Sequence, residues 1–482
     1  MDAIIVSTSN PRQENYWQKR LKEMRGFFTK PDTVVIAVCE DWPNGAGNGL
    51  GTLYAYYKAQ EKARFMYNTD LYEMQKQGGS IVIYHTAGLG KRLFPLTASE
   101  FNNKSAIKLP GFFEDNQLTI LEAVILQTSH FVKNRPGRLS VFWGDQLFIP
   151  YSNINEVPQH HIEILGQSLD TITEEDWSKK KLANYGLLAI SPSKRVKLLE
   201  KIDYHLLQDF INAGKISSKD KFAMSLGSFS LSAQMTFSLL REYAHDLQSQ
   251  RGSLDSDPHF WMPLTLDRDS YLKLMSKNEH PETKSLQHYQ RMESFKTKFL
   301  QLHSDAAFFG FVDIGKSGFW WDYGSIDSYY NNVLKLTSKG PEGQALRLFY
   351  QIDPTKQDNK SNRLITDENS CLINCNIRAG KISNSVLIGV SANSIEAENC
   401  VIINSNFLSV KANQSLFYHI KEDADVVFSP GTIRADVVLP TTNEHLKIYS
   451  HRDRNGKEDW NITLPQNTFS FQEVYEKLKS EE

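Results

Sequence analysis

The sequence predicts an α/β protein with a parallel sheet, followed by a C-terminal region of stacked β-strands. Short apolar strands alternate with helical stretches over the first 150 residues. Strands that alternate with helices favour βαβ units and a sheet covered by helices on both faces. Near Leu364 the sequence pattern changes to short β-rich segments separated by Asn, Ser and Gly. Short strands with frequent turn residues predict a stacked β-solenoid.

The elements of the first part follow one another in a simple order. Each expected strand ends before a turn or a helix, and ligands of a parallel sheet bind at the C-terminal ends of its strands. The expected strands are Ala3–Val6, Thr33–Val38, Ser80–Tyr84 and Leu139–Trp143, and the expected helices are Tyr16–Phe28, Thr52–Met66 and Thr119–Val132.

The rest of the chain has a coarser pattern. Residues 151–339 mix loops and aromatic residues, and Phe469–Lys479 predicts a capping helix. The solenoid repeat reads as irregular. Its expected pieces are Cys371–Ile377, Ser385–Ile388, Ile395–Ala397 and Cys400–Asn406, with Asn at positions 369, 374, 376, 384, 393, 399, 404 and 406.

Composition limits the class of protein. The chain has 482 residues, with 54 Lys and Arg against 56 Asp and Glu, and this near-neutral balance argues against a nucleic-acid partner or a polybasic membrane surface. No run approaches the roughly 20 apolar residues of a membrane span. The first residues lack the pattern of a signal peptide. The four cysteines form no CxxC pair, so we expect a cytoplasmic protein without a disulfide scaffold or zinc ribbon.

Two glycine-rich segments are candidates for binding a phosphate ligand. The first runs from Gly45 to Thr52, and the second runs from Gly88 to Arg92 and is followed by Pro-Leu-Thr at 95–97. Glycine lets the backbone approach a ligand, and a helix N-terminus offers N–H groups to phosphate. Neither segment fits the dinucleotide fingerprint or the P-loop, and each alone could be a tight turn.

Cations and carboxylates near the second glycine segment add to the signal. Lys104 follows this segment, Gly144-Asp145 follows an expected strand, and Asp322 lies in an aromatic stretch. Two carboxylates near phosphates are a common way to hold Mg²⁺. Lys108 is an alternative to Lys104, and Asp313 is an alternative to Asp322.

These motifs together resemble the sugar-1-phosphate nucleotidyltransferases, also called sugar-nucleotide pyrophosphorylases. The family signature GxGxRxxPLT followed by a Lys matches residues 88–97 and Lys104. The Gly-Asp element matches residues 144–145, and the element W-x-D-x-G-T matches residues 320–325 with Ser in place of Thr. The family's Glu-Lys sugar segment matches Glu200-Lys201, a less specific match.

The order of the motifs departs from the usual family arrangement. A Gly-Thr that contacts the base normally follows the signature, whereas here Gly51-Thr52 precedes it. Only about a dozen residues separate the helix Thr119–Val132 from Gly144-Asp145, which leaves no room for that unit in its usual place. We therefore infer a permuted strand order. This order resembles the GDP-fucose pyrophosphorylase group (fucose-1-phosphate guanylyltransferases), which makes GTP and a fucose-like sugar phosphate a lead.

The resemblance implies a fold and a domain division. The fold would be a Rossmann-like (GT-A-like) nucleotidyltransferase domain with permuted strand order, followed by a left-handed β-helix. The catalytic domain would span 1–345, with its sugar-binding part at about 151–310. The β-helix would span 360–450 and support a homo-oligomer, and a strand and helix would occupy 451–482.

The resemblance also implies a role for each site residue in condensing a nucleoside triphosphate (GTP or UTP) with a sugar 1-phosphate. Arg92 and Lys104 would be catalytic, and Asp145 and Asp322 would hold Mg²⁺. The nucleotide would meet Gly49, Gly51, Thr52, Ala87, Gly88 and Gly90, and the sugar phosphate would meet Gly186, Glu200, Lys201 and Gly227.

Other readings stay open at this point. Glu200 and Lys201 could be a solvated strand end, and His85 and the pair His160-His161 read as structural or solvated. The chain could also be a non-catalytic nucleotide-sugar sensor or regulatory subunit that keeps the pocket without the chemistry. A solenoid acyltransferase is less favoured, because His419 is the sole His between Asp305 and Asn443.

Overall fold

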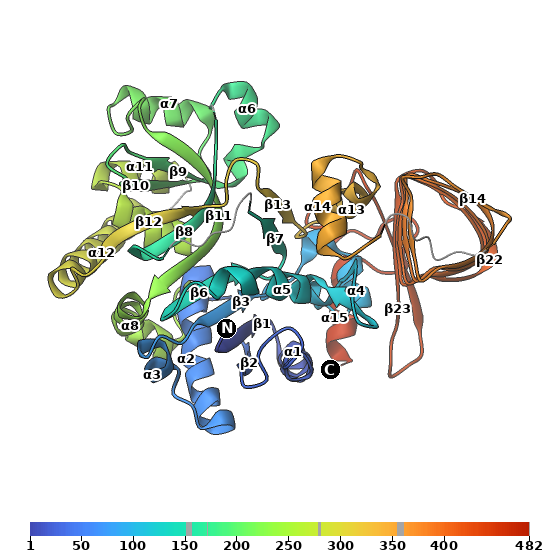
Figure 1. The fold of residues 1–482 in the computed structure, drawn as a ribbon, viewed down its shortest axis with the longest axis horizontal. Helices are drawn as coiled ribbons and strands as arrows, with labels where there is room; N and C mark the ends of the chain where they lie inside the picture. Colours follow the sequence, from blue (N-terminus) through green and yellow to red (C-terminus); the bar gives the residue numbers. More distant parts are fainter. Residues whose placement is uncertain (151–156, 171, 278–280, 354–360, 482) are drawn as a thin grey trace. The chain divides into compact units, whose positions relative to one another are not determined.

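The computed structural model describes the chain except for residues 151–156, 171, 278–280, 354–360 and 482 (Figure 1). It forms two compact units. Unit 1 comprises residues 1–87, 126–143 and 148–319, and unit 2 comprises 88–125, 144–147 and the residues from 320 onward. The units are not the predicted domains, because residues 88–125 pack with the C-terminal strands. The predicted boundaries at 151 and 360 lie outside the described residues, and the division into domains stays a prediction.

Unit 1 is built on one large mixed sheet, whose path runs β10-β9-β11-β6-β3-β1-β2, with β8 and β12 joined through β11. The four strands β2, β1, β3 and β6 are parallel, and β11 runs antiparallel to β6. The α/β prediction with a parallel sheet is therefore confirmed. The strands are β1 (Ala3–Thr8), β2 (Val34–Cys39), β3 (Ile81–His85), β6 (Arg138–Trp143), β8 (His160–Ser168), β9 (Gly186–Ile190), β10 (Val196–Glu200), β11 (Lys221–Ser232) and β12 (Ala307–Asp313).

Helices of unit 1 cover this sheet. Figure 1 shows α1 and α2 on opposite sides of β1 and β2. The first begins earlier than expected, because Asn10 caps it by accepting a hydrogen bond from Gln13 N and Pro11 takes the first position. The helices are α1 (Pro11–Glu23), α2 (Gly47–Tyr67), α3 (Leu71–Lys76), α6 (Glu174–Lys179), α7 (Tyr204–Asn212), α8 (Ala233–Glu242), α9 (Ala244–Ser249), α10 (Met262–Thr265), α11 (Arg268–Lys277) and α12 (Glu282–Leu302), with the short turns η3 (Leu182–Asn184) and η4 (Ser256–Trp261).

The smaller elements around the signature segment have their own core in unit 2. Phe94 and Ala98 pack with Trp460 and with Phe471 of the terminal helix, which explains why residues 88–125 belong to this unit. The elements are η1 (Lys91–Leu93), α4 (Leu96–Ser99), η2 (Lys104–Ala106), β4 (Lys108–Phe113), β5 (Asn116–Thr119), α13 (Ile326–Leu334), η5 (Lys335–Thr337), α14 (Pro341–Phe349) and α15 (Phe471–Ser480). Three further elements are α5 (Ile120–Val132), β7 (Gln146–Ile149) and β13 (Phe319–Asp322).

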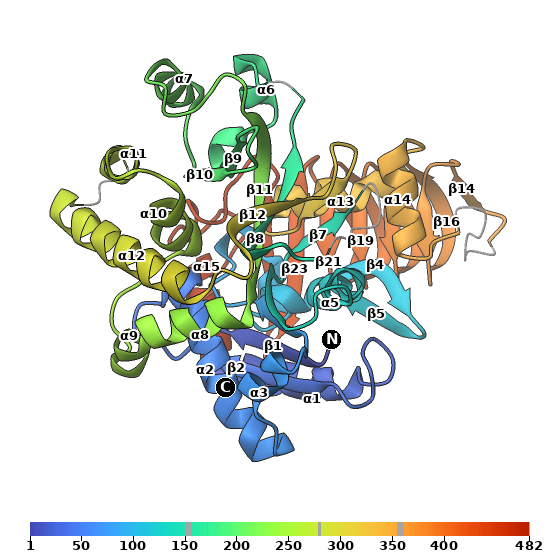
Figure 2. The same cartoon turned by 60° about the vertical axis from the view of Figure 1, so that its left-hand side comes forward.

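The C-terminal strands of unit 2 form two sheets of parallel neighbours, here called the stacked-strand region (residues 364–438; Figure 2). Each coil contributes one strand to each sheet around an apolar interior. One sheet holds β14 (Leu364–Thr366), β16 (Asn376–Ser383), β18 (Ser391–Glu398), β20 (Asn406–Asn413) and β22 (Lys421–Val427). The other holds β15 (Cys371–Ile373), β17 (Val386–Ile388), β19 (Val401–Ile403), β21 (Leu416–Tyr418) and β23 (Thr432–Val438), with β24 (His445–His451) antiparallel to β23.

The repeat is regular from Cys371 to Leu416, where the sequence suggested an irregular one, and it becomes irregular at the last coil, where Leu416 pairs with Ile433. Cys371 pairs with Val386 and Val386 with Val401, a step of 15 residues per coil. Asparagine marks the corners, because Asn384 and Asn399 both adopt positive φ, which Asn tolerates better than most residues. The predicted C-terminal region of stacked strands is confirmed, and the handedness of its coil stays a prediction.

Within the described ranges, no helix combines the length and the apolar character that a membrane-spanning segment needs.

Candidate functional site

Four residues predicted from the sequence come together in unit 2: Arg92, Lys104, Asp145 and Asp322. Arg92 lies on η1, Lys104 begins η2, and Asp322 ends β13. Lys104 Nζ is 3.3 Å from Asp145 Oδ2. The backbone joins the two acidic segments, since Tyr323 N donates to Asp145 O at 2.8 Å. The signature loop and two later turns therefore present their charges at one place, here called the acid–base cluster.

Gly324 defines the space at the centre of the acid–base cluster. A Cβ atom at this position would lie 2.8 Å from Asp322 Oδ1, 3.3 Å from Asp145 Oδ2 and 3.4 Å from Arg92 Nη2. These three polar atoms from three segments therefore face a gap that any side chain at 324 would fill. The backbone N–H of Gly324 also donates to Asp322 Oδ1 at 2.6 Å.

The electrostatics of the cluster favour a bound cation. Burial raises the pKa of Asp322, and the nearby Asp145 carboxylate raises it further, against the lowering effects of the Gly324 hydrogen bond, Arg92 and Lys104. A carboxyl whose pKa is raised by a neighbouring carboxylate gains from a positive charge placed between the two. The cluster therefore suits a ligand that carries its own cation.

The donor set fits Mg²⁺ but does not complete its coordination. In the part of the chain that the structure describes, His, Cys, Asp and Glu side chains form no group of three or more that could hold a metal ion. Mg²⁺ is commonly held by one or two carboxylates together with substrate phosphates and water. Asp145 and Asp322 are such a pair, and the gap beside Gly324 lies next to both.

The structure separates the alternatives that the sequence left open for the cluster. Lys104, rather than Lys108, contacts Asp145, whereas Lys108 lies on β4 with its backbone N–H bonded to the Tyr418 hydroxyl. Asp313 ends β12, where its carboxylate accepts hydrogen bonds from Ser168 and from Gly315 N. Asp313 thus closes a local turn, and Asp322 is the carboxylate that accompanies Asp145.

The second glycine segment keeps an open backbone. Gly88 has φ +114°, and a Cβ atom there would meet no described atom within 4 Å. Gly90 has φ +62°, and a Cβ atom there would lie 3.2 Å from Lys104 Cβ. Glycine is therefore needed at 90 both for its left-handed backbone and for the approach of Lys104. Ala87, which follows β3 and Thr86, is partly exposed.

The first glycine segment is part of a helix rather than a free loop. Gly47, Gly49 and Gly51 lie in the first turns of α2. The N–H groups of Gly49 and Leu50 donate to Leu254 O at 2.9 and 3.1 Å, and that of Asn48 donates to Asp255 Oδ1. This helix N-terminus is thus bonded to the chain itself, so the expectation of free N–H groups for phosphate is wrong for this segment.

Thr52 and Gly51 nevertheless border a small polar group in unit 1. Thr52 Oγ1 is 2.7 Å from His85 Nε2 and donates to Asn48 O. The ring of His85 lies 5.4 Å from that of Trp143. A Cβ on Gly51 would lie 2.8 Å from Glu40 Oε2, a carboxyl whose pKa is raised by burial. Glu40 follows the buried strand β2, a signal that could have identified it from the sequence.

The residues predicted to meet the sugar phosphate also come together in unit 1. Glu200 pairs with Gly186 across β10 and β9, and Lys201 Nζ lies 3.1 Å from Glu200 Oε1. Glu200 is not a solvated strand end, because its side chain is only 11% exposed. Gly227 has φ +74° at an irregularity in β11, and a Cβ there would lie 2.4 Å from Trp143 Nε1.

Asp255 and Asp257 lie near Glu200 and belong to no sequence motif. The pKa values of Glu200 and Asp257 are raised by burial, and each carboxylate has one oxygen that is buried with no hydrogen-bond partner among the described residues. Asp255 adds to the charge around both. Asp257 lies on η4, a short π-helix, and π-helical turns are frequent at functional sites. No local pattern in the sequence distinguishes Asp255 or Asp257.

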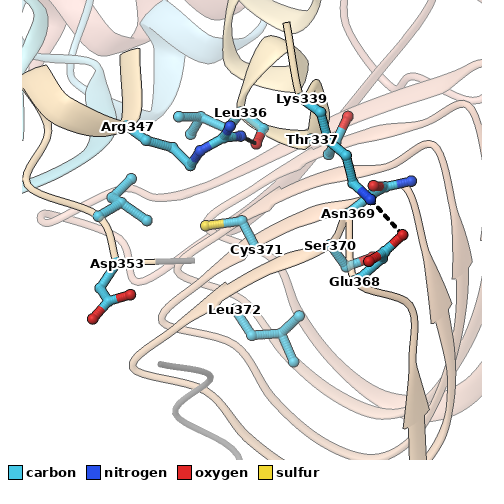
Figure 3. Close-up of a pocket in the computed structure, with 11 residues that line it drawn as sticks. Leu336, Thr337, Lys339, Arg347, Asp353, Glu368, Asn369, Ser370, Cys371 and Leu372 are labelled. Atoms are coloured by element: carbon cyan, nitrogen blue, oxygen red, sulfur yellow. Dashed lines mark hydrogen bonds and ion pairs between the residues drawn. The ribbon is translucent and has the colours of Figure 1, made fainter. Parts of the chain in front are cut away.

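Another hollow of unit 2 contains none of the predicted site residues (Figure 3). It has a volume of about 200 Å³. Figure 3 shows the thiol of Cys371 between Arg347 and Leu372, and an ion pair between Lys339 and Glu368. Burial raises the pKa of the Cys371 thiol to about 12. The thiol is therefore neutral and unreactive near pH 7.

Comparison with known proteins gives little further help. No protein-family model matches the chain, and no curated protein matches it. Among solved structures, a similar chain is described as a glucose-1-phosphate thymidylyltransferase from Bacillus anthracis in complex with a sucrose. It is 15% identical, and the match covers 69% of this chain and 93% of the other, with a TM-score of 0.20. At that TM-score the likeness carries no argument, and the site geometry stands by itself.

Proposed function

We propose that the protein is a sugar-1-phosphate nucleotidyltransferase, which joins a nucleoside triphosphate to a sugar 1-phosphate and releases pyrophosphate. The observation that carries this proposal is the acid–base cluster: two cations and two carboxylates from three separate segments around Gly324. A mixed set of this kind suits phosphates that arrive with a divalent cation.

The proposed reaction requires little covalent chemistry from the protein. An oxygen of the sugar phosphate attacks the α-phosphorus, a new P–O bond forms, and the bond to the β-phosphate breaks to release pyrophosphate. Positioning and neutralisation of charge would carry most of the rate. In this proposal Arg92 holds the leaving pyrophosphate with its planar fork, and Lys104 bridges the α-phosphate and the attacking phosphate.

Asp145 and Asp322 would hold Mg²⁺, the implied cofactor. When bound, Mg²⁺ offsets phosphate charge, roughly several kcal/mol of it in the transition state. The carboxylates themselves position the phosphates relative to Arg92 and Lys104. Gly88 and Gly90 would let the backbone approach the triphosphate, while Ala87, Gly49, Gly51 and Thr52 would border the nucleoside.

The acidic group around Glu200 suits the sugar rather than its phosphate. Glu200, Asp255 and Asp257 offer several carboxyl oxygens that can accept hydrogen bonds from hydroxyls, against the single cation of Lys201. We assign the sugar hydroxyls to Glu200, with Lys201, Gly186 and Gly227 nearby. GTP or UTP as donor, and a fucose-like sugar, are finer proposals that rest on the motif order. The same resemblance leads us to propose a left-handed β-helix and a homo-oligomer formed through it.

The test is a matrix of the four nucleoside triphosphates against a panel of sugar 1-phosphates, read as pyrophosphate release. We expect one pair to turn over in the presence of Mg²⁺. Arg92→Ala should abolish pyrophosphate release. Arg92→Lys should keep only part of it, because lysine retains the positive charge but lacks the planar guanidinium that binds phosphate through two hydrogen bonds. Binding without turnover for every pair would instead support a non-catalytic sensor or regulatory subunit.

A further inference from the structure

A cavity of about 850 Å³ in unit 1 lies at the opposite end of β6 from Trp143. Its walls include Arg138, the first residue of β6, and His161, the second residue of β8. Ser232, at the end of β11, pairs with Arg138 across the sheet. The cavity therefore lies at the amino ends of parallel strands and shares no residue with the clusters described above.

Arg138 brings a buried positive charge to this wall. Its side chain donates to Ser230 Oγ, to Ser230 O at 2.9 Å and to His160 O at 2.8 Å, all neutral acceptors. The neighbouring carboxylate of Glu163 is ion-paired with Arg135 instead. Burial lowers the pKa of Arg138 to about 10, so the guanidinium remains charged near pH 7. Arg135, Arg138 and Glu163 together leave one positive charge without a bonded carboxylate, a costly state that an anion would relieve.

His161 adds a polar atom to the same wall. Its side chain is 1% exposed, and among the described residues Nε2 has no hydrogen-bond partner. The Ser232 hydroxyl lies 2.9 Å from Nδ1, and when it donates to Nδ1 the neutral ring carries its hydrogen on Nε2. His161 then offers an N–H donor.

Helix α8 contributes its positive end. β11 runs directly into α8 (Figure 1), Ser232 caps the helix by accepting from Met235 N, and Gln234 in the first turn lines the cavity. The helix dipole favours a negative charge at this point. Arg241, an exposed residue of the same helix, also lines the cavity. Three independent features thus favour an anion.

One carboxylate of the chain already lies at this place. Asp305 Oδ1 is 3.6 Å from His161 Nε2, and Asp305 Oδ2 is 3.4 Å from Gln234 Nε2. Asp305 is 63% exposed, so water and salt screen its charge and the side chain can move aside. Phe237 provides an apolar surface in the same cavity.

We propose that this cavity binds a small phosphate monoester, with the phosphoryl group at Arg138, His161 and the start of α8 and the organic part along Phe237. Asp305 holds the phosphoryl position in the free protein and competes with the ligand. The site is separate from the proposed reaction and does not depend on it.

The experiment follows the histidine ring signals of ¹³C-histidine-labelled full-length protein by NMR at low salt, with glycerol 3-phosphate as the probe. Inorganic phosphate and glycerol are run in parallel, and signals are assigned through His161→Asn and through His303→Asn, which changes a second histidine of the cavity wall. We expect saturable shifts of His161 and His303 with the ester, weaker binding of inorganic phosphate and none of glycerol. The affinity should fall with added NaCl.

Two variants change the affinity in opposite directions, which misfolding would not do. Arg241→Ala should weaken binding about threefold, and Asp305→Asn should strengthen it by a similar factor, the size expected for one screened charge. Arg195→Ala, which removes an exposed cation elsewhere in unit 1, is the matched control and should leave binding unchanged.

Three results would overturn the proposal. They are the absence of a saturable shift at His161 and His303, equal affinities for Arg241→Ala and Arg195→Ala, and weaker binding by Asp305→Asn. The titration is repeated with Arg92→Ala. Loss of binding there would show that the shifts report the acid–base cluster instead. Tighter binding of inorganic phosphate than of the ester would contradict the assignment of the ligand class.

Discussion

Lys104 Nζ lies 3.3 Å from Oδ2 of Asp145, so the cation of one signature element is paired with the carboxylate of another. The two residues are 41 positions apart in the sequence, and their side chains are 17% and 16% exposed. The pair is partly shielded from water, which strengthens the attraction between the two side chains. A phosphate that binds at Lys104 would replace Asp145 as the anionic partner of this lysine.

This pair gives the first prediction. Lys104→Ala should lower pyrophosphate release about a hundredfold or more, the usual effect of losing one donor to transition-state charge. Lys108→Ala is the matched control, because Lys108 lies four residues further on and does not contact Asp145. Activity assays with thermal unfolding as a check on folding decide the outcome. Equal losses in the two variants would remove Lys104 from the proposed role.

Gly324 gives the second prediction. Gly324→Ala places a methyl group 2.8 Å from Asp322 Oδ1 and 3.3 Å from Asp145 Oδ2, which must push the carboxylates apart. We expect weaker binding of Mn²⁺, used as a paramagnetic substitute for Mg²⁺, in electron paramagnetic resonance titrations with nucleotide present. Gly340→Ala is the control, since a Cβ there meets only Ser338 Oγ at 3.4 Å. Unchanged Mn²⁺ affinity in Gly324→Ala would show that the metal does not bind in the gap beside Gly324.

Glu200 gives the third prediction. Glu200→Gln keeps the shape of the side chain and removes the charge that accepts hydrogen bonds from hydroxyls, so the KM for the sugar 1-phosphate should rise about tenfold. The KM for the nucleoside triphosphate should stay the same. Glu175→Gln, an exposed change on α6, is the control. A rise in the nucleotide KM instead would place Glu200 with the other substrate.

Local patterns predicted the elements well where one residue type dominates. The apolar strands before Gly88 and Asp145 form as expected, because buried strands of a parallel sheet are continuous apolar runs. The stacked-strand region was found through its asparagines, but its 15-residue step was not. The corner residues with positive φ include Asn384, Gly389 and Gln414, so no single residue type recurs at every corner.

The acid–base cluster was foreseen because its members lie in motifs, whereas contacts that depend on long-range packing were missed. Asp255 and Asp257 follow no pattern, and their place is set by the return of residues 254–256 to the start of α2. That contact also explains the first glycine segment. A Cβ would lie 2.7 Å from Leu254 O at Gly47 and 2.8 Å from it at Gly49, so these two glycines permit a close approach of two backbone segments.

A buried carboxyl beside the signature loop gives the last prediction, which concerns stability. Glu100 is 12% exposed, its Oε1 accepts from the Tyr418 hydroxyl at 2.5 Å, and burial raises its pKa from 4.5 to about 6 despite the opposing effects of Lys108 and Tyr418. The folded state therefore binds this proton more tightly than the unfolded state. The stabilisation is complete below pH 4.5 and is lost as the pH rises to about 6.

Glu100→Gln should remove this dependence. Between pH 4 and pH 7 the wild-type protein should lose about 2 kcal/mol relative to the variant, since one pKa unit corresponds to about 1.4 kcal/mol. The measurement is the difference in thermal midpoint between the two proteins across this range, and Glu114→Gln, an exposed change in unit 2, is the control. A midpoint difference that stays constant with pH would mean that Glu100 is ionised equally in both states, and Tyr418 would then bond a permanently charged carboxylate.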